Sequence, residues 1–269
     1  MIKNVLTIAG SDPSGGAGVQ ADLKAFAANG VYGMAVLKAV TAHNTQGVAG
    51  VQLVPPPFVK AQIEAVFADV RVDAVKIGMI ATADIALAVA EALSDHQDIP
   101  IVLDPVMVAK GGAPLLQEDA MAALRTALVP LAMLLTPNLP EAGRLLKNAE
   151  ARDRETMANQ ARALTNLGPE IALVKGGHLV GQDSPDVLWD GAELHWFEGP
   201  RMATKNTHGT GCTLSSTLAA QLAKGLKPKD AVCEAKSYVS GAIAAADQQS
   251  VGHGHGPVHH FYDLWKDET

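Results

Sequence analysis

The sequence is poor in aromatic residues, in cysteine and in net positive charge, and each shortage excludes a class of protein. Aromatic side chains make up only 4% of the 269 residues, so a core must be built mostly from alanine, valine, leucine and isoleucine. The two cysteines, Cys212 and Cys233, offer neither a disulfide framework nor the spacing of a metal site. The net charge of −7 argues against a nucleic-acid partner, which needs a concentrated basic face.

Long hydrophobic runs are also missing. The apolar segment Val5–Gly10 is shorter than the hydrophobic part of a signal peptide, and Asp12 follows it almost at once. No stretch approaches the ~18 apolar residues that are needed to cross a bilayer. Because 48% of the residues are hydrophobic, the chain can still bury a large core. We therefore expect a cytoplasmic globular protein with no membrane partner.

Short apolar runs alternate with helical patterns through most of the chain. Strands are predicted at 5–8, 32–41, 74–77, 101–103, 133–135 and 171–174, and helical patterns begin near 19, 56, 82, 118, 140 and 154. This alternation predicts an α/β fold with a mostly parallel sheet and helices on both faces. Asp190-Gly191 lies between two apolar runs and predicts a hairpin, which adds a small antiparallel edge.

The C-terminal part departs from this alternation. From Thr210 onward two successive helices are predicted, and small residues line the second one. Two helices with no strand between them count against a closed eight-stranded barrel, which is the main alternative topology. No internal repeat or low-complexity linker interrupts the chain, so we predict a single domain over residues 1–269.

Polar residues follow the predicted strands, at the sheet edge where open α/β sheets bind their ligands. They are Gly10-Ser11-Asp12, Lys76-Ile77-Gly78, Asp104-Pro105, Thr136-Pro137-Asn138 and Lys175-Gly176-Gly177. We expect two carboxylates, two lysines and several glycines to face one crevice. Such a set suits a charged, metal-bound ligand.

The segment from Lys205 to Thr213 is glycine-rich and runs directly into a predicted helix. Its glycines allow backbone N–H groups to approach an anion, and the helix N-terminus adds partial positive charge. Such a cradle stabilises the charge on a phosphoryl group during transfer. Cys212 falls in the first turn, where the helix dipole is expected to lower the thiol pKa and provide a proton acceptor. The alternative interpretation is ordinary turn chemistry beside a buried cysteine.

Seven sequence blocks resemble the hydroxymethylpyrimidine/phosphomethylpyrimidine kinase family of thiamine biosynthesis. They are AGSDPSGGAGVQADLK at 9–24, KIGM at 76–79, LDPVM at 103–107, TPNLPEA at 136–142, VKGGH at 174–178, KNTHGTGCTLS at 205–215 and GPVHHF at 256–261. The resemblance implies a ribokinase-like three-layer α/β/α sandwich, ATP and Mg²⁺ as cofactors, and a homodimer. It also implies phosphorylation of the small hydroxymethylpyrimidine substrate and then of its monophosphate.

The resemblance implies roles for the residues that match the family's motifs. Cys212 looks like the base that deprotonates the hydroxymethyl group, with an anion hole made of Gly209, Thr210 and Gly211. Lys175 resembles the lysine that reaches the ATP phosphates, and Thr210 contributes to the same nucleotide site. Asn138 and Glu141 match the N-x-x-E that positions magnesium, and Asp104 lies near the metal and phosphates. The pyrimidine contacts would come from Gly10, Asp22, Met79 and Val106.

One position departs from the family. The family usually has glutamine in T-A-Q-N-T, where it contacts the pyrimidine, whereas this chain has His43. An imidazole offers one donor and one acceptor, placed differently from those of an amide. We expect pyrimidine binding with altered affinity or pH response, or a shifted ring specificity.

Three alternatives remain open at this stage. A pyridoxal or pyridoxine kinase shares the fold and has an acceptor group in a similar place. A ribokinase-type sugar kinase usually has aspartate where Cys212 stands. A non-catalytic ligand sensor should have lost the metal and phosphate residues. An ion pair between Asp22 and Lys236 is a further hypothesis, with a solvated surface pair as its alternative, and a structural role is expected for His178 and His208.

Overall fold

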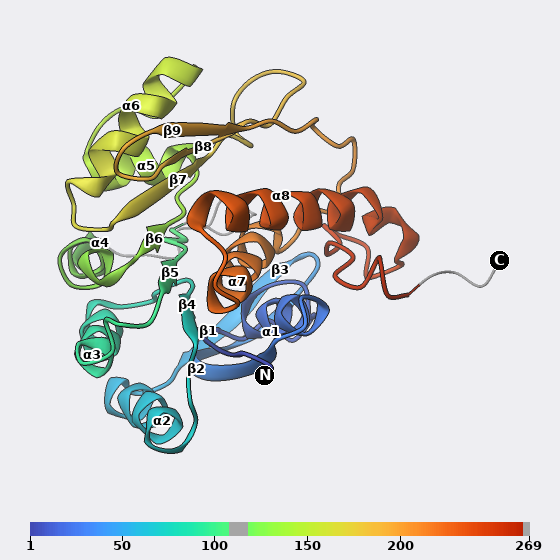
Figure 1. Cartoon of the computed structure of the whole chain (residues 1–269). Coiled ribbons are helices and arrows are strands. Elements are labelled where there is room, and N and C mark those ends of the chain that lie inside the picture. The colour runs from blue at the N-terminus through green and yellow to red at the C-terminus, as the bar shows by residue number, and fades with distance from the viewer. Residues whose placement is uncertain (108–117, 266–269) are drawn as a thin grey trace.

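A nine-stranded sheet organises the computed structural model, which describes residues 1–107 and 118–265 (Figure 1). The strand order is β3-β2-β1-β4-β5-β6-β7-β8-β9. The strands are β1 Asn4–Gly10, β2 Tyr32–Asn44, β3 Gly47–Leu53, β4 Ala74–Ile77, β5 Ile101–Leu103, β6 Leu134–Leu135, β7 Ile171–Lys175, β8 Asp186–Trp189 and β9 Leu194–Phe197. Strands β2, β1, β4, β5, β6 and β7 are parallel. This open order confirms the predicted parallel sheet and is not that of a closed barrel.

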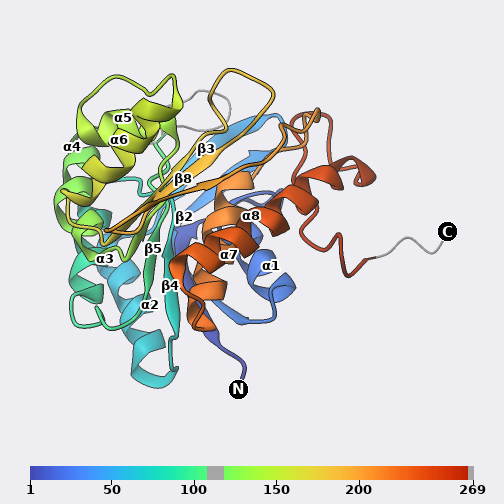
Figure 2. The same cartoon turned by 45° about the horizontal axis from the view of Figure 1, so that its top comes forward.

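Eight α-helices are described, and they cover both faces of the sheet. They are α1 Gly18–Ala28, α2 Pro56–Asp69, α3 Ala83–Leu93, α4 Glu118–Ala123, α5 Leu139–Leu146, α6 Arg154–Thr165, α7 Thr210–Ala223 and α8 Pro228–Ala244. Helices α1, α7 and α8 lie on one face, and α2 to α6 lie on the other (Figures 1 and 2). The expected three-layer α/β/α arrangement is therefore confirmed. Within the described ranges, no helix combines the length and apolar character needed to span a membrane.

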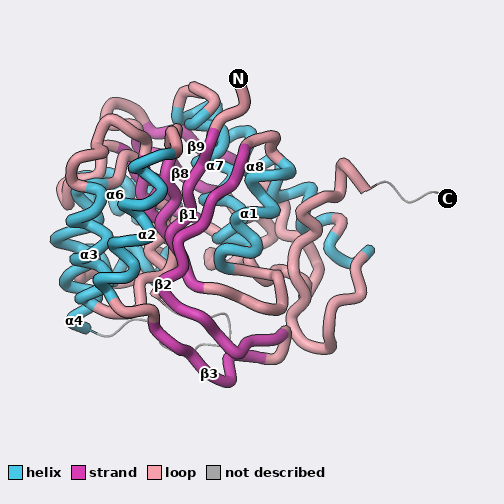
Figure 3. Tube along the Cα trace, turned by 90° about the horizontal axis from the view of Figure 1, so that it is seen from below, coloured by secondary structure: helices cyan, strands magenta, loops and turns pink. Residues whose placement is uncertain are grey.

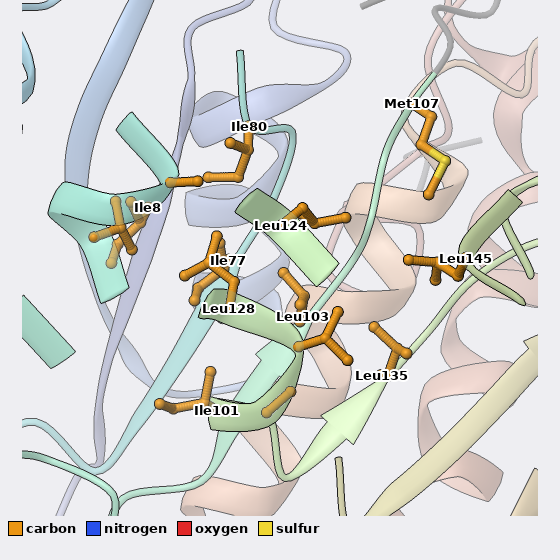
Figure 4. Packing of buried hydrophobic residues seen from close by; sticks show 14 of the residues in the cluster. Ile8, Ile77, Ile80, Ile101, Leu103, Met107, Leu124, Leu128, Leu135 and Leu145 are labelled. Carbon is orange, nitrogen blue, oxygen red and sulfur yellow. The ribbon is translucent and has the colours of Figure 1, made fainter. Parts of the chain in front are cut away.

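The two faces of the sheet bury separate hydrophobic clusters. Along β1, Val5 packs in the cluster under α1, α7 and α8, whereas the next residue, Leu6, packs in the cluster under α2 to α6. Strand β5 repeats this alternation with Val102 and Leu103. Figure 4 shows the second cluster, in which Leu103 lies among other aliphatic side chains. The strands read as continuous apolar runs because both of their faces are covered.

The antiparallel edges of the sheet were only partly predicted. The hairpin of β8 and β9 at one edge is confirmed. At the other edge, β2 runs on past β1 and pairs antiparallel with β3 (Figure 3), a strand that the sequence analysis missed. Every residue of β3 is exposed. It therefore lacks the alternation of buried and exposed residues by which a strand is recognised.

Several helices begin at the residues that the sequence marks. The Thr82 hydroxyl accepts a hydrogen bond from the Ile85 amide at the start of α3. The Asp153 carboxylate caps α6 in the same way, with 2.7 Å to the Thr156 amide. Side chains of this type satisfy amides that have no partner within the helix. The predicted helix starts near residues 82 and 154 are thereby confirmed.

Candidate active site

The carboxyl ends of the parallel strands meet along one edge of the sheet. Four backbone hydrogen bonds step across this edge: Gly78 N to Ile8 O at 3.0 Å, Asp104 N to Ile77 O at 2.9 Å, Thr136 N to Leu103 O at 3.0 Å, and Lys175 N to Pro137 O at 2.9 Å. The polar residues that follow the strands are therefore neighbours in space. The expectation that these residues gather at one edge of the sheet is therefore confirmed.

Helix α7 begins at this edge with a backbone shape that requires glycine. Gly209, its N-cap, has φ of +78° and no side chain to cap the helix. A Cβ on Gly209 would overlap the carbonyl oxygen of Gly16. The hydroxyls of Thr210 and Thr213 donate to the carbonyl oxygens of Thr207 and Gly209 at 2.8 Å each, so neither hydroxyl caps the helix. The first turn therefore presents amide groups of the kind that bind anions.

A lysine and a carboxylate lie directly against this turn. Lys175 Nζ donates to Asp104 Oδ1 at 2.8 Å, and Asp104 is fully buried. A Cβ on Gly211 would lie 3.4 Å from Asp104 Oδ2 and 3.6 Å from Lys175 Nζ. Burial opposes the charge on Lys175, but the carboxylates of Asp104 and Glu141 outweigh it and raise the lysine pKa. The ammonium group therefore stays charged beside the start of α7.

The thiol of Cys212 differs from the sequence expectation. Burial raises its pKa to about 11, and the nearby Lys76 ammonium lowers it only in part. The Gly18 amide donates a hydrogen bond to the sulfur, which also favours the thiolate without reversing the shift. The expectation of an acidic thiol is therefore wrong for this structure. Desolvation of the charged form exceeds the effect of the helix dipole.

Asn138 and Glu141 form a capping box at the start of α5. The Asn138 side chain accepts from the Glu141 amide at 2.9 Å, and the Glu141 carboxylate accepts from the Asn138 amide at 2.8 Å. Burial raises the pKa of Glu141 to about 7; Lys175 lowers it, and Asp104 adds to the rise. Two buried carboxylates thus share one lysine. An oxygen donor set with surplus negative charge fits Mg²⁺.

Asp22 is held in a different ion pair from the one we expected. Both of its oxygens lie 2.9 Å from Lys76 Nζ, and both residues are fully buried. The hydroxyls of Thr7 and Ser216 donate to the same carboxylate at 2.6 and 2.7 Å. Lys236 instead pairs with Asp186 at 2.6 Å. The hypothesis of an Asp22–Lys236 pair is therefore wrong.

The other residues expected to contact the pyrimidine lie along the ends of β1, β4 and β5. A Cβ on Gly10 would lie 3.4 Å from the terminal carbon of Met79, so these two residues are neighbours. Val106 follows Asp104, to whose carbonyl oxygen its amide donates at 2.8 Å. His43 lies at the end of β2, where its ring meets that of His208 edge-on at 5.2 Å between centroids.

Lys38 was missed by the sequence analysis. It is fully buried on β2, and its Nζ approaches the Met79 sulfur at 4.0 Å. Burial lowers its pKa to about 7, with a further lowering from Lys76 and opposing contributions from Cys212 and Asp22. The signal was available, because Lys38 is the one charged residue in the apolar run from Ala35 to Val40.

The C-terminal segment also reaches the start of α7. His260 Nε2 lies 3.1 Å from Thr213 Oγ1, and the Tyr238 hydroxyl donates to the His260 carbonyl oxygen at 2.6 Å. The His208 amide donates to Gly256 O at 3.0 Å. No periodic pattern in the sequence could have shown these contacts, because the C-terminal segment that makes them carries no helix or strand signal.

Comparison with known proteins agrees with this geometry. Residues 12–259 match the family described as phosphomethylpyrimidine kinase. The hydroxymethylpyrimidine/phosphomethylpyrimidine kinase of Escherichia coli is 53% identical over 262 residues, covering 97% of this chain and 98% of that protein.

Solved structures show the same fold. The phosphomethylpyrimidine kinase of Clostridium difficile is 41% identical with a TM-score of 0.81, covering 90% of this chain and 99% of that one. The pyridoxal kinase of Bacillus subtilis, solved with ADP, is 35% identical with a TM-score of 0.89, covering 97% and 98% of the two chains. A family match over most of its length, joined to high identity over nearly all of it, shows that this chain belongs to the phosphomethylpyrimidine kinase family.

Proposed function

We propose that this chain transfers the γ-phosphoryl group of ATP to 4-amino-5-hydroxymethyl-2-methylpyrimidine and then to the resulting monophosphate, as a step of thiamine biosynthesis. The observation that carries this proposal is the position of Gly211, at the start of α7, against both Asp104 and Lys175. The amides of this helix start, a charged lysine and a buried carboxylate thereby lie close together. Phosphoryl transfer depends on such positioned positive charge.

The start of α7 is assigned to the transferring phosphoryl group. Amides of Gly209, Thr210 and Gly211 form the anion hole, and Lys175 reaches the phosphates of the nucleotide. Support comes from the +78° φ of Gly209, which lets the chain turn into the helix close to Gly16. Donors fixed before the reaction stabilise developing charge without further reorganisation.

Cys212 is assigned to the proton of the substrate hydroxyl. With its pKa raised to about 11 by burial, the thiol keeps its proton in the ligand-free protein near neutral pH. To accept the hydroxyl proton, the thiol must first lose its own, so this role requires that ligand binding favours the thiolate. The high pKa then makes that thiolate a strong acceptor. The second phosphorylation has a phosphate acceptor that is already largely ionised near pH 7. It should therefore depend much less on this residue.

Asp104 and Glu141 would hold a magnesium ion, with Asn138 beside them. When bound, this ion neutralises charge on the phosphate oxygens of the nucleotide. The Glu141 side chain already caps α5, so its position is fixed before any ligand arrives. The Asp104 carboxylate is also oriented, by the 2.8 Å contact with Lys175.

The pyrimidine is assigned to the neighbouring ends of β1, β2, β4 and β5. Gly10, Met79 and Val106 would contact its ring, and His43 would bond to its polar edge. Asp22 would lie near the ring, but its carboxylate already accepts hydrogen bonds from Lys76, Thr7 and Ser216. Its contribution to substrate binding is then mainly electrostatic.

Pyridoxal phosphorylation is a second candidate activity. It is favoured by the likeness to pyridoxal kinases, such as that of Staphylococcus aureus solved with AMP-PCP and pyridoxal, at 33% identity and a TM-score of 0.89 over 98% of this chain and 95% of that one. The higher identity to the pyrimidine kinase of E. coli favours the pyrimidine. A coupled ADP-release assay with the pyrimidine, its monophosphate and pyridoxal in parallel decides between them. A kcat/KM that is higher for pyridoxal than for the pyrimidine would overturn the first proposal.

We also propose that the chain is one domain that works as a cytoplasmic homodimer. Support for the dimer comes from exposed aliphatic side chains on the β2–β3 edge, where Val40 and Val51 are 50% and 52% exposed. Exposed apolar patches on sheet edges commonly mark interfaces. The two unpaired cysteines suit a reducing compartment. Sedimentation equilibrium of the purified chain tests the dimer.

A further inference from the structure

Among the described residues, one group of three metal-ligating side chains lies close together. The ligand atoms of Asp12, His43 and His208 are all within 4.8 Å of one another. His208 Nε2 lies 2.8 Å from Asp12 Oδ2, and His43 Nδ1 lies 3.4 Å from Asp12 Oδ1. The two histidines come from the end of β2 and from the loop before α7, far apart in sequence.

Each of the three side chains is held by its own segment. The Asp12 carboxylate accepts from the Ser14 amide at 2.9 Å and from the Ala17 amide at 2.8 Å, which fixes its orientation. His43 directly follows a shift in the β2–β3 pairing register, which occurs after Ala42. His208 is bridged to Pro257 through its backbone. The group is therefore organised before any ligand binds.

We propose that Asp12, His43 and His208 form a site for one transition-metal ion of the Zn²⁺ type, separate from the magnesium site. Two imidazole nitrogens and one carboxylate are a donor set that Zn²⁺ binds and that Mg²⁺ does not favour. Three protein ligands leave a further position for water or another small ligand.

The distances suit such an ion. Bonds of about 2.0–2.1 Å in a tetrahedral arrangement place neighbouring ligand atoms roughly 3.3 Å apart. The 3.4 Å separation of His43 and Asp12 already has this value. The 2.8 Å contact of His208 and Asp12 is a hydrogen bond, and a bound ion would take the place of its proton.

The side chains are also reachable. His43 and His208 keep 16% and 12% of their side-chain surface exposed, whereas Asp12 keeps 3%. A positive charge that opposes a cation is that of Lys24, whose Nζ donates to Gly15 O at 2.8 Å and which interacts with Asp12. The carboxylate itself is held ionised: burial opposes this, but hydrogen bonds and the two histidines lower the Asp12 pKa well below its usual value.

A consequence follows if His43 contacts the pyrimidine, and this part rests on the proposed function. An ion on His43 Nδ1 leaves only the Nε2–H donor, so the ring can no longer accept a hydrogen bond from the substrate. Zn²⁺ should then inhibit competitively with the pyrimidine and leave the apparent KM for ATP unchanged. The inhibition is a separate readout from binding.

Isothermal titration of the full chain with Zn²⁺, in excess Mg²⁺, tests the site. We expect one ion per chain, and at least about tenfold weaker binding in His43→Gln and His208→Gln. The matched control is His253→Gln, which changes an exposed histidine of the C-terminal segment and should bind as the wild type does. Circular dichroism establishes that each variant is folded.

Titration with Co²⁺ identifies the ligands. We expect visible absorption of a four- or five-coordinate ion without the thiolate charge-transfer band that ligation by Cys212 or Cys233 would give. Equal Zn²⁺ affinity in the wild type and in His43→Gln, or a thiolate band, overturns the site. Tight, His43-dependent binding with no competition against the pyrimidine would retain the site and remove His43 from the proposed substrate contacts.

Discussion

Lys175 donates to the fully buried carboxylate of Asp104 across 2.8 Å. The pair lies against Gly211, the second residue of α7. A ligand phosphate at this helix start must therefore share the lysine with Asp104. The ion pair thus sets the charge that the nucleotide meets.

Removing the lysine tests this relationship. Lys175→Met should lower kcat for both phosphorylations by about 10²–10³, the range for losing one donor to transition-state charge. Initial rates at saturating ATP measure the effect. Lys224→Met, which changes an exposed lysine at the other end of α7, is the control and should keep the wild-type rates. Unchanged kcat in Lys175→Met would separate the lysine from the reacting phosphate.

Removing the thiol should separate the two phosphorylations. Cys212→Ala should slow the first step by about 10²–10⁴, the range for a lost base, and affect the second step much less. Quench-flow measurements that start from the pyrimidine and from its monophosphate give the two rates separately. Equal losses in both steps would exclude a base role for Cys212.

The raised pKa of Cys212 can be tested by the pH dependence of its alkylation. Only the thiolate reacts with iodoacetamide, so the modification rate of Cys212 should keep rising about tenfold per pH unit until the pH nears 11. Peptide mass spectrometry can follow Cys212 and the exposed Cys233 in the same sample. A Cys212 rate that levels off below pH 9 would contradict the burial argument.

The requirement for glycine at the start of α7 can be tested by comparing Gly209, before the helix, with Gly225, after it. Gly209 and Gly225 both have positive φ, +78° and +89°, but only Gly209 lies against another backbone segment. Among the described residues, nothing lies within 4 Å of a Cβ on Gly225. Gly225→Ala should cost about 1–2 kcal/mol from left-handed strain alone. Gly209→Ala should cost about 1–3 kcal/mol more from overlap, and it should also lose activity.

Urea unfolding of the two glycine variants measures the difference. Since both substitutions introduce alanine at a similar φ, the backbone strain largely cancels in the comparison. Equal destabilisation would mean that the start of α7 shifts to accommodate the methyl group.

Lys38 should destabilise the protein near neutral pH. Its pKa is about 7 in the folded chain and about 10.4 when unfolded, so the unfolded state binds more protons between these values. Stability contributed by this group therefore rises with pH over that window and falls as the pH drops through it. Lys38→Met should be more stable than the wild type by a few kcal/mol at pH 7, with a smaller gain at pH 9.5.

Chemical unfolding of both proteins at the two pH values isolates Lys38, because the other groups are common to both. The lysine's presence would then reflect function rather than stability, since it lies beside Met79 and Cys212. A Lys38→Met variant less stable than the wild type at pH 7 would show that the ammonium has a stabilising partner.

The sequence predicts most of the fold because the inner strands are buried on both faces. The apolar runs around Ile77 and Leu103 are recognisable as strands without knowledge of their neighbours. Strand β3 was not recognisable, because its residues face solvent and its pairing with β2 gives no hydrophobic pattern. Hydrophobic patterns in a sequence identify strands that bury side chains, and they do not identify a strand whose side chains are all exposed.

The sequence predicts which strand-end residues come together better than it predicts their electrostatics. The positions of Asp104 and Lys175 after their strands were enough to bring them together. The partner of Asp22 was misassigned because Lys76 and Lys236 offer the same charge, and only the packing of β4 against α1 and α7 decides between them. The acidity of Cys212 was misjudged for a related reason: a sequence shows where a helix starts but not how much water reaches it.

The buried Asp22–Lys76 pair joins β1, β4, α1 and α7, through Thr7 and Ser216. Removing either charged residue would leave the other charge unpaired and away from water, and removing either hydroxyl would take a donor from the Asp22 carboxylate. These four elements should therefore be rigid, and their backbone amides should be among the slowest in the protein to exchange with deuterium. In the free subunit, larger motion then falls to the β2–β3 ribbon, whose solvated hydrogen bonds open at far lower cost until a partner subunit covers them.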